Sequence, residues 1–460
     1  MAWNKRFTKP VSHYRLGPLT LLRFAESITV DRVAVREMTP EERTFVTEFR
    51  RSSHLPLSVI EVTNTQLEKS IIDATWAVRR SFLNTGFHDF DQQLQGTEHK
   101  VVKDAALFGN AEAPQISSIS LYRPNTKEGD PRLWIYGLQR HIRLAEGDLL
   151  LLAVAQDAVA VLNLTRPPND GRELGHHCRA TLLTMDKRNS SATGDYEQVT
   201  PSAAVGELPS QSEPRFEQVH SSQAAAEILL AKLRAIALAG PIETTKKGDT
   251  AVGFALESAL GIKQNSSIDP DFLGIELKAT RTNSTTRVNL FAQVPNWSIS
   301  QFKSSEALLD AFGYVDAKGR DALQVTVKSS KPNTQGLRLR PDFATGYLDE
   351  ISEQNGVQSP VVRWEVDKLI DRLTTKHAET FWVTLSETKG NGVSSFTLNS
   401  LVHTRLPDPT AFGLLIADDA ITLDHLIARR TKGVTEKGPL FKIWHNDLPA
   451  LFHVEAEYEL

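Results

Sequence analysis

The chain has 460 residues, and 52 Lys and Arg against 56 Asp and Glu give it a formal net charge of −4. A hydrophobic content of 40% and a charged content of 23% are ordinary for a globular protein and exclude a disordered or fibrous one. The single cysteine, Cys178, excludes a disulfide framework. We find neither an apolar stretch of membrane-spanning length nor a secretory leader, so we expect a cytoplasmic protein of two or three domains.

The first part of the chain is predicted to be rich in β-strands. Turn-forming residues around Asn125, Gly129 and Gly147 separate its apolar segments. The strand-like segments are residues 118–122, 133–136, 148–154 and 159–164, whereas residues 70–83 have the period of a helix. We assign residues 1–186 to this N-terminal domain.

Residues 187–222 are polar, rich in Ser, Gln and Pro, and without apolar period, so we interpret them as a linker. The remaining residues, 223–460, mix helical and strand patterns. We expect helices at 223–239 and 360–375, and strands at 287–294, 322–327, 381–385 and 396–398. This mixture predicts an α/β domain.

The most informative stretch lies in the middle of the chain. Residues 249–262 have the spacing of a short helix, with Glu257 in its last turn and Gly261 where a left-handed residue ends a helix. In the strand that follows, Glu276 and Lys278 share one face, and Asp271 precedes them by one tight turn. Two converging carboxylates favour Mg²⁺, and a neighbouring ammonium suits phosphodiester hydrolysis. The alternative is a solvated ion pair on a surface strand.

Residues 248–262 (GDTAVGFALESALGI) and 269–278 (DPDFLGIELK) together resemble the catalytic block of the MvaI/BcnI family of type II restriction endonucleases. The resemblance implies a MutH-like PD-(D/E)xK α/β nuclease core. It implies catalytic roles for Glu257, Asp271, Glu276 and Lys278, and a Mg²⁺ site made by Asp271, Glu276 and the carbonyl of Leu277. It also implies a monomer that cuts double-stranded DNA at a short CC-N-GG-type site, with CCWGG favoured, beside a cognate DNA methyltransferase in the same host.

Residues 132–138 (RLWIYGL) and 147–150 (GDLL) resemble the B3-like effector domain of the EcoRII-N type, which precedes some restriction nucleases. This resemblance implies a β-rich pseudobarrel that binds DNA. A second copy of the recognition site would then stimulate cleavage, which is type IIE behaviour.

Candidate DNA contacts are basic side chains and histidines outside the catalytic residues. A basic segment is as often a solvated face as a nucleic-acid surface, so each candidate has that alternative. The candidates are Arg281, His425, Arg429, Arg430, Lys432, Lys437 and Lys442 in the C-terminal part, and Arg79, Arg80, Lys100 and Arg123 in the N-terminal part.

Two other functions remain open at this point. One is a DNA-binding regulator that keeps the nuclease fold without cleaving. The other is a MutH-like nicking enzyme that depends on a partner protein. The complete set of Glu257, Asp271, Glu276 and Lys278 disfavours the first, and nothing in the chain indicates a partner for the second.

Overall fold

The computed structural model describes residues 36–69, 71–109, 111, 113–126, 129–192, 214–262, 270–282, 284, 286–354, 356–390 and 393–460. Asp269, most of the expected linker and the first 35 residues lie outside this range. In the described part of the chain, no helix is both long and apolar enough to cross a membrane.

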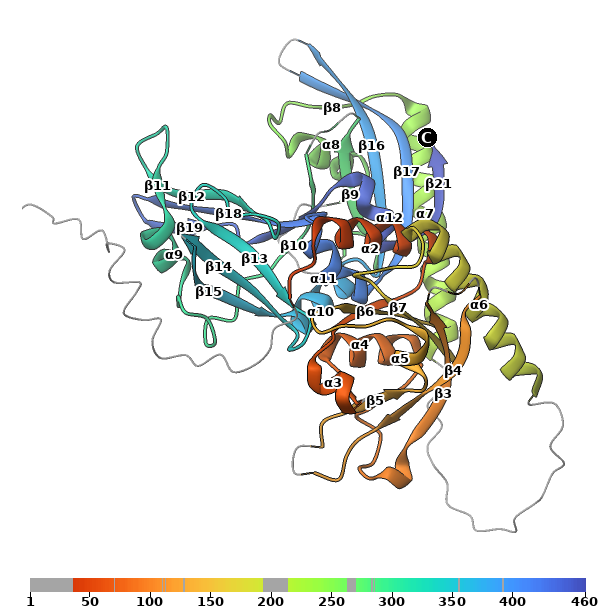
Figure 1. The fold of residues 1–460 in the computed structure, drawn as a ribbon. Helices are drawn as coiled ribbons and strands as arrows, with labels where there is room; N and C mark the ends of the chain where they lie inside the picture. Colours follow the sequence, from red (N-terminus) through yellow and green to blue (C-terminus); the bar gives the residue numbers. More distant parts are fainter. Residues whose placement is uncertain are drawn as a thin grey trace, which may run out of the picture.

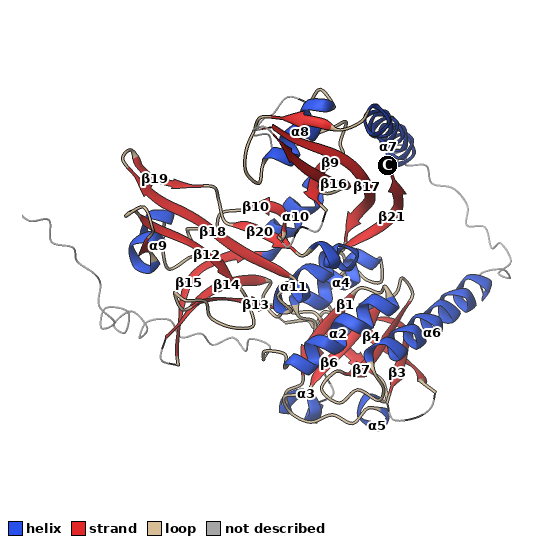
Figure 2. Cartoon of the chain, turned by 90° about the horizontal axis from the view of Figure 1, so that it is seen from above, coloured by secondary structure: helices blue, strands red, loops and turns tan. Residues whose placement is uncertain are grey.

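Three lobes surround a pair of central helices, α10 (Val366–Lys376) and α11 (Pro409–Ala417) (Figures 1 and 2). The N-terminal lobe contains a mixed sheet of strand order β1-β6-β7-β3-β4-β5-β2. Its strands are β1 (Leu57–Glu61), β2 (Ile72–Asp73), β3 (Val101–Phe108), β4 (Gln115–Tyr122), β5 (Arg132–Ile135), β6 (Leu149–Val154) and β7 (Ala158–Asn163). Its helices are α2 (Pro40–Ser53), α3 (Asn64–Lys69), α4 (Trp76–Thr85), α5 (Leu138–His141) and α6 (Gly171–Ala192).

The apolar run in β6 explains why this sheet is covered on both faces. Leu149 and Leu151 pack with Phe49 of α2, whereas Leu150 and Leu152 pack with Phe82 of α4. Successive strand residues point to opposite faces, so a continuous apolar run needs apolar partners on both. Cys178 of α6 is fully buried in the first cluster.

The second lobe contains Glu257, Asp271, Glu276 and Lys278, and its sheet has the order β21-β17-β16-β9 with β8 paired to β17. These strands are β8 (Ile242–Thr244), β9 (Glu276–Arg281), β16 (Glu379–Gly390), β17 (Val393–Pro407) and β21 (Phe452–Glu459). Helices α7 (Pro214–Ala239) and α8 (Ala251–Ala259) pack on it through Leu229, Leu233 and Leu256. The edge strand β9 runs parallel to β16, with Glu276 opposite Thr380.

The third lobe contains two further sheets that share one core. The first has the order β10-β20-β18-β12-β11, with β19 paired to β18, and the second has the order β13-β14-β15. The strands are β10 (Val288–Ala292), β11 (Tyr314–Val315), β12 (Asp321–Val327), β13 (Leu337–Asp342), β14 (Tyr347–Gln354), β15 (Val357–Glu365), β18 (Ile421–Arg430), β19 (Gly433–Glu436) and β20 (Leu440–Ile443). Helix α9 (Ser305–Phe312) lies beside β12, and the short α12 (Leu448–Leu451) follows β20.

Most of the expected elements are confirmed, but three boundaries were wrong. The helix expected from residue 223 begins at Pro214, inside the expected linker. Residues 360–365 belong to β15, and only from Val366 does the chain become helical. Residues 72–73 form β2 before α4 begins at Trp76. In the second case Val361 and Val362 are β-branched, and Val362 pairs with Glu350 of β14, which sequence period alone does not reveal.

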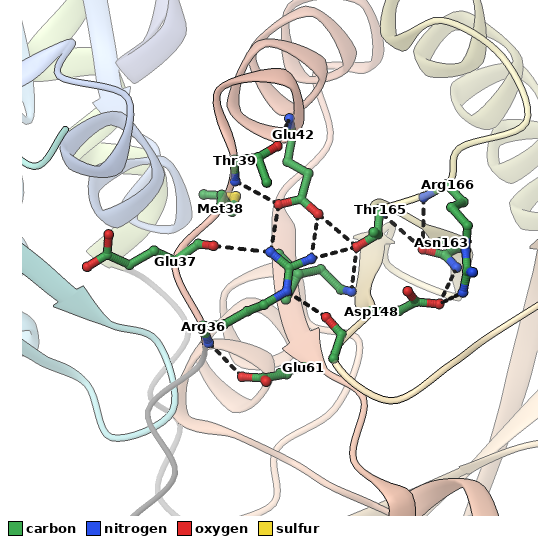
Figure 3. A network of polar contacts seen from close by, with 12 residues as sticks. Arg36, Glu37, Met38, Thr39, Glu42, Glu61, Asp148, Asn163, Thr165 and Arg166 are labelled. Atoms are coloured by element: carbon green, nitrogen blue, oxygen red, sulfur yellow. Dashed lines mark hydrogen bonds and ion pairs between the residues drawn. The ribbon is translucent and has the colours of Figure 1, made fainter.

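A polar network ties the start of the described chain to the N-terminal sheet (Figure 3). The Arg36 guanidinium donates to both carboxylate oxygens of Glu42, at 2.6 and 2.9 Å, and to Thr165 Oγ1 at 2.8 Å. Glu42 also accepts from the Thr39 N–H, which closes the capping box of α2. Burial alone would raise the pKa of Glu42, but the hydrogen bonds from Arg36, Thr39 and Thr165 outweigh it and lower that pKa.

We expect Glu42→Gln to destabilise the N-terminal lobe by about 2 kcal/mol at neutral pH, because it removes a buried charge-assisted hydrogen-bond acceptor. The lowered pKa means that the ionised carboxylate stabilises the fold above its unfolded pKa and that this stabilisation is lost as pH falls. The difference in the free energy of unfolding between this variant and the unmodified protein should therefore shrink below about pH 4.5. Calorimetric unfolding over this pH range measures it, with the exposed neighbour Glu41→Gln as the control. A difference that is independent of pH would contradict the assignment.

Candidate active site

A tight hairpin turn places Asp271 beside strand β9. Phe272 and Ile275 exchange backbone hydrogen bonds of 2.9 and 2.8 Å, and Leu273 and Gly274 between them have φ of +47° and +89°. A two-residue turn of this kind requires positive φ at both central positions. Glycine adopts it readily, whereas Leu273 is strained there and is also 70% exposed. The turn reverses the chain within two residues, so Asp271 comes back alongside the first residues of β9.

Glu276 is the most deeply buried member of the site, at 1% exposed. Its Oε1 accepts from the ammonium of Lys278, two residues along β9, and from the ammonium of Lys376 at 3.0 Å. Its other oxygen, Oε2, is buried without a hydrogen-bond partner. The neighbouring Ile275 and Leu277 enter the apolar core, so the alternation predicted for this strand is confirmed.

Asp271 lies close enough to Glu276 for the charge of Glu276 to influence its ionisation. Oδ2 of Asp271 accepts a 3.0 Å hydrogen bond from the Leu277 N–H. Burial and, after it, the negative charge of Glu276 raise the pKa of Asp271 above its ordinary value. The Leu277 N–H and the two lysines act in the opposite direction without cancelling the rise. Two carboxylates that disfavour each other's charge, one with an unsatisfied oxygen, fit a divalent cation.

Glu257 stands on α8, which packs on β9 through Val252 and Leu256. The helix ends as the sequence predicts, with Gly261 in the left-handed region at φ +74°. Oε1 of Glu257 lies 3.8 Å from the position that a Cβ would occupy at Gly253, so the side chain extends back along its own helix. Among the described residues, no group of three or more His, Cys, Asp or Glu is close enough to hold a metal ion. The role of Glu257 thus stays a prediction.

Sequence reasoning missed Lys376, the last residue of α10. It is 98 positions away from Lys278 in the chain, yet both ammonium groups contact the same oxygen of Glu276. The adjacent His377 is fully buried, and its pKa is lowered to about 3 by burial and by the charges of Lys278 and Lys376. The neutral ring therefore donates from Nε2 to the Leu290 carbonyl at 2.9 Å and accepts from the Thr380 hydroxyl at Nδ1. These bonds anchor the residue next to Lys376.

The structure corrects the prediction for His425 and gives other candidates intramolecular partners. His425 is 0% exposed and bonds to the buried Glu350, so it cannot contact a DNA groove in this structure. Arg281 pairs with Glu387 at 2.7 Å. Arg429 pairs with Glu306 and Asp310, which offsets the charge expected to face DNA.

The remaining C-terminal candidates differ in exposure. Lys442 of β20 pairs with Asp424 at 2.8 Å. Arg430, Lys432 and Lys437 are exposed in and around the β18–β19 hairpin and remain candidates for phosphate contact. The hairpin lies at the far end of the third lobe from α10 and α11 (Figure 2).

In the N-terminal lobe, Lys100 is exposed and stays a candidate. Arg123 donates to the carbonyls of Gly129 and Gln93, and its role is therefore to hold two loops together. Arg80 lies 3.6 Å from Asp367 of α10. Arg79 and Arg80 both line a hollow beside α4. Two of these four predicted contacts thus have structural partners within the protein.

Residues 230–452 match the model of the MvaI/BcnI restriction endonuclease family, and this match spans the site described above. The C-terminal part of the chain is therefore similar to the restriction endonucleases of this family. No curated protein matches the chain.

Two solved structures are similar to the chain at low identity. The complex of the restriction endonuclease MvaI with cognate DNA shares 19% identity over 51% of this chain and 97% of that one, with a TM-score of 0.45. The same enzyme in the absence of DNA shares 17% identity over 54% and 99%, with a TM-score of 0.32. The similarity to the family rests on the family match and not on these two likenesses.

We expect opposite effects on stability from neutralising the two carboxylates of the metal-free protein. Asp271→Asn should raise the melting temperature, because the raised pKa shows that the ionised form is disfavoured by folding at neutral pH. Glu276→Gln should lower it by about 5 °C, because two partly buried ammonium groups lose their shared counter-charge. Thermal unfolding of both variants in EDTA measures this. Equal shifts in the same direction would contradict the described charge arrangement.

Proposed function

We propose that the protein is a type II restriction endonuclease that hydrolyses phosphodiester bonds in double-stranded DNA with a divalent metal, Mg²⁺ in the cell. The family match over residues 230–452 carries this proposal, because it includes the carboxylate pair and the lysine of the site. The local geometry supports it independently. Asp271 and Glu276 converge, Glu276 has an unsatisfied buried oxygen, and two lysines face them.

Asp271, Glu276 and the carbonyl of Leu277 would hold the metal ion, which supplies Lewis-acid stabilisation of a phosphate oxygen when bound. The protein's own groups then have distinct tasks. The Lys278 ammonium would orient the attacking water and offset negative charge that develops on the phosphate. Glu257 would complete the site from α8. Lys376 would hold Glu276 in position from the end of α10, so that the carboxylate keeps one orientation.

Lys278→Ala should reduce Mg²⁺-dependent cleavage of plasmid DNA by at least about 100-fold, since a group that acts on the developing charge is removed. Binding of the cognate duplex, measured in Ca²⁺ by gel shift, should change little. The matched control is Lys389→Ala, an exposed lysine on the neighbouring β16. Full cleavage by Lys278→Ala would exclude its catalytic role.

The same plasmid-cleavage experiment distinguishes a restriction endonuclease from a DNA-binding regulator that does not cleave. A regulator would bind a specific duplex and leave plasmid DNA intact in the unmodified protein too. A nicking enzyme would convert supercoiled plasmid to open circles without producing linear DNA. We favour cleavage of both strands because the resemblance of residues 248–278 is to enzymes that cut duplex DNA.

We further propose that the recognition site is of the CC-N-GG type and that the N-terminal lobe is a B3-like effector domain. The N-terminal lobe has its own mixed sheet and its own core, and it lies before the residues that match the nuclease family. Digesting a mapped plasmid and sequencing the ends identifies the site and the cut position.

For a type IIE enzyme, a plasmid with two sites should be cut about tenfold faster than one with a single site, because tethering raises the effective concentration of the second site. Adding a short cognate duplex should restore the rate on the single-site plasmid. A matched duplex with one base pair changed in the site is the control. Equal rates on both plasmids, unaffected by the duplex, would exclude an effector role for the N-terminal lobe.

A further inference from the structure

Helix α10 connects the junction of the lobes with the candidate active site. Asp367, its second residue, faces the N-terminal lobe, and Lys376, its last residue, contacts Glu276. At about 1.5 Å per residue, the nine steps between them span about 14 Å. The apolar face of α10, with Val366, Leu369 and Leu373, is buried in the core of the third lobe. A short helix held along its whole length in this way moves as one unit.

The N-terminal lobe holds the first turn of α10 through α4. The indole N–H of Trp76 donates to Oδ2 of Asp367 at 3.1 Å, and Arg80 lies 3.6 Å from Oδ1. These two residues are one helical turn apart on α4, so they face Asp367 together. Their contact crosses from a lobe outside the nuclease-family match to a helix within it.

Backbone bonds at the same place make the junction specific. The first two N–H groups of α4, those of Trp76 and Ala77, donate to the carbonyls of Ala344 and Phe343 in the β13–β14 turn. Gly346 of that turn accepts from the Val366 N–H, the first of α10, at 2.9 Å. A Cβ on Gly346 would lie 2.7 Å from the Trp76 ring, so only glycine fits beneath it. One turn of the third lobe thus contacts both helices.

At its other end, α10 places Lys376 in contact with Glu276. The next residue, His377, forms hydrogen bonds with Leu290 of β10 and Thr380 of β16. Glu276 therefore contacts one lysine of its own strand and one at the end of α10, the helix whose first turn contacts the N-terminal lobe. Only the second can transmit a displacement from that lobe.

We propose that Trp76 is a positioning residue for the nuclease centre, acting through Asp367 and α10 on Lys376. This inference rests on the proposed function, and it deepens it by assigning the route along which the N-terminal lobe influences the metal site. A ligand that displaces α4 would withdraw or advance Lys376, and it would thereby change how Glu276 presents its carboxylate to the metal.

Other contacts between the N-terminal lobe and the rest of the chain bypass α10. Arg50 pairs with Asp408, at the start of α11, and Arg51 pairs with Asp447 beside α12. Arg51 is the more exposed of the two arginines and provides a control variant. Its substitution removes a contact of the N-terminal lobe with the rest of the chain, but that contact does not involve α10. Arg51→Ala should leave metal affinity and cleavage unchanged.

The test is a double-mutant cycle of Trp76→Phe with Lys376→Met in the full-length protein. Phenylalanine keeps the aromatic packing and removes only the N–H donor to Asp367. We measure Mn²⁺ affinity by calorimetry and, separately, kcat and KM for cleavage of a cognate duplex. Trp76→Phe should weaken Mn²⁺ binding and lower kcat by about three- to tenfold with KM nearly unchanged. In the Lys376→Met background the same change should have no further effect.

Additive effects of the two substitutions on Mn²⁺ affinity would overturn the proposal, as would an equal loss in Arg51→Ala. Asp367→Ala should reproduce Trp76→Phe, because it removes the same contact from the other side. An unmodified protein that binds Mn²⁺ but does not cut DNA would refute the proposed function. The double-mutant cycle, measured by Mn²⁺ affinity, would still test whether Trp76 acts on the site through Asp367 and α10. A protein that binds no Mn²⁺ at all would refute both.

Discussion

The buried carboxylate of Glu276 is the interaction on which the candidate active site depends. A carboxylate that is 1% exposed is costly without compensation, and here two ammonium groups meet one of its oxygens. The second oxygen has no hydrogen-bond partner, and burial and, after it, the negative charge of Glu276 raise the pKa of the nearby Asp271. The proposed divalent cation would relieve both of these unfavourable features.

The compensation comes from parts of the chain that are far apart in sequence. Lys278 follows Glu276 on the same strand, whereas Lys376 reaches it from the end of α10, after the chain has formed strands β10 to β15 of the third lobe. These strands lie between β9 and α10 in the chain, and the helix stands at the centre of the molecule (Figure 1). The first turn of α10 contacts α4 of the N-terminal lobe.

Sequence reasoning was least successful for charged residues with distant partners. Arg429 stands in a basic segment, and only the fold shows that α9 supplies Glu306 and Asp310 to it. His425 was grouped with exposed basic residues, but β18 places it in the interior against Glu350 of another sheet. Exposure is decided by which face of a strand a neighbouring sheet covers, and a local pattern does not contain that information. The boundary at residue 366 was misplaced for the same reason, since the pairing of β15 with β14 keeps residues 360–365 extended.

The sequence by itself determined the short-range part of the site. The alternation of residues 275–278, the turn with Gly274 and the helix that ends before Gly261 follow from local periodicity and backbone preference. Because Asp271, Glu276 and Lys278 lie within eight positions, local geometry was enough to bring them together. The tertiary structure alone decided that Lys376 joins them and that α10 touches the N-terminal lobe. Those contacts join residues separated by 100 and 291 positions, and only the packed fold brings such residues within hydrogen-bond distance.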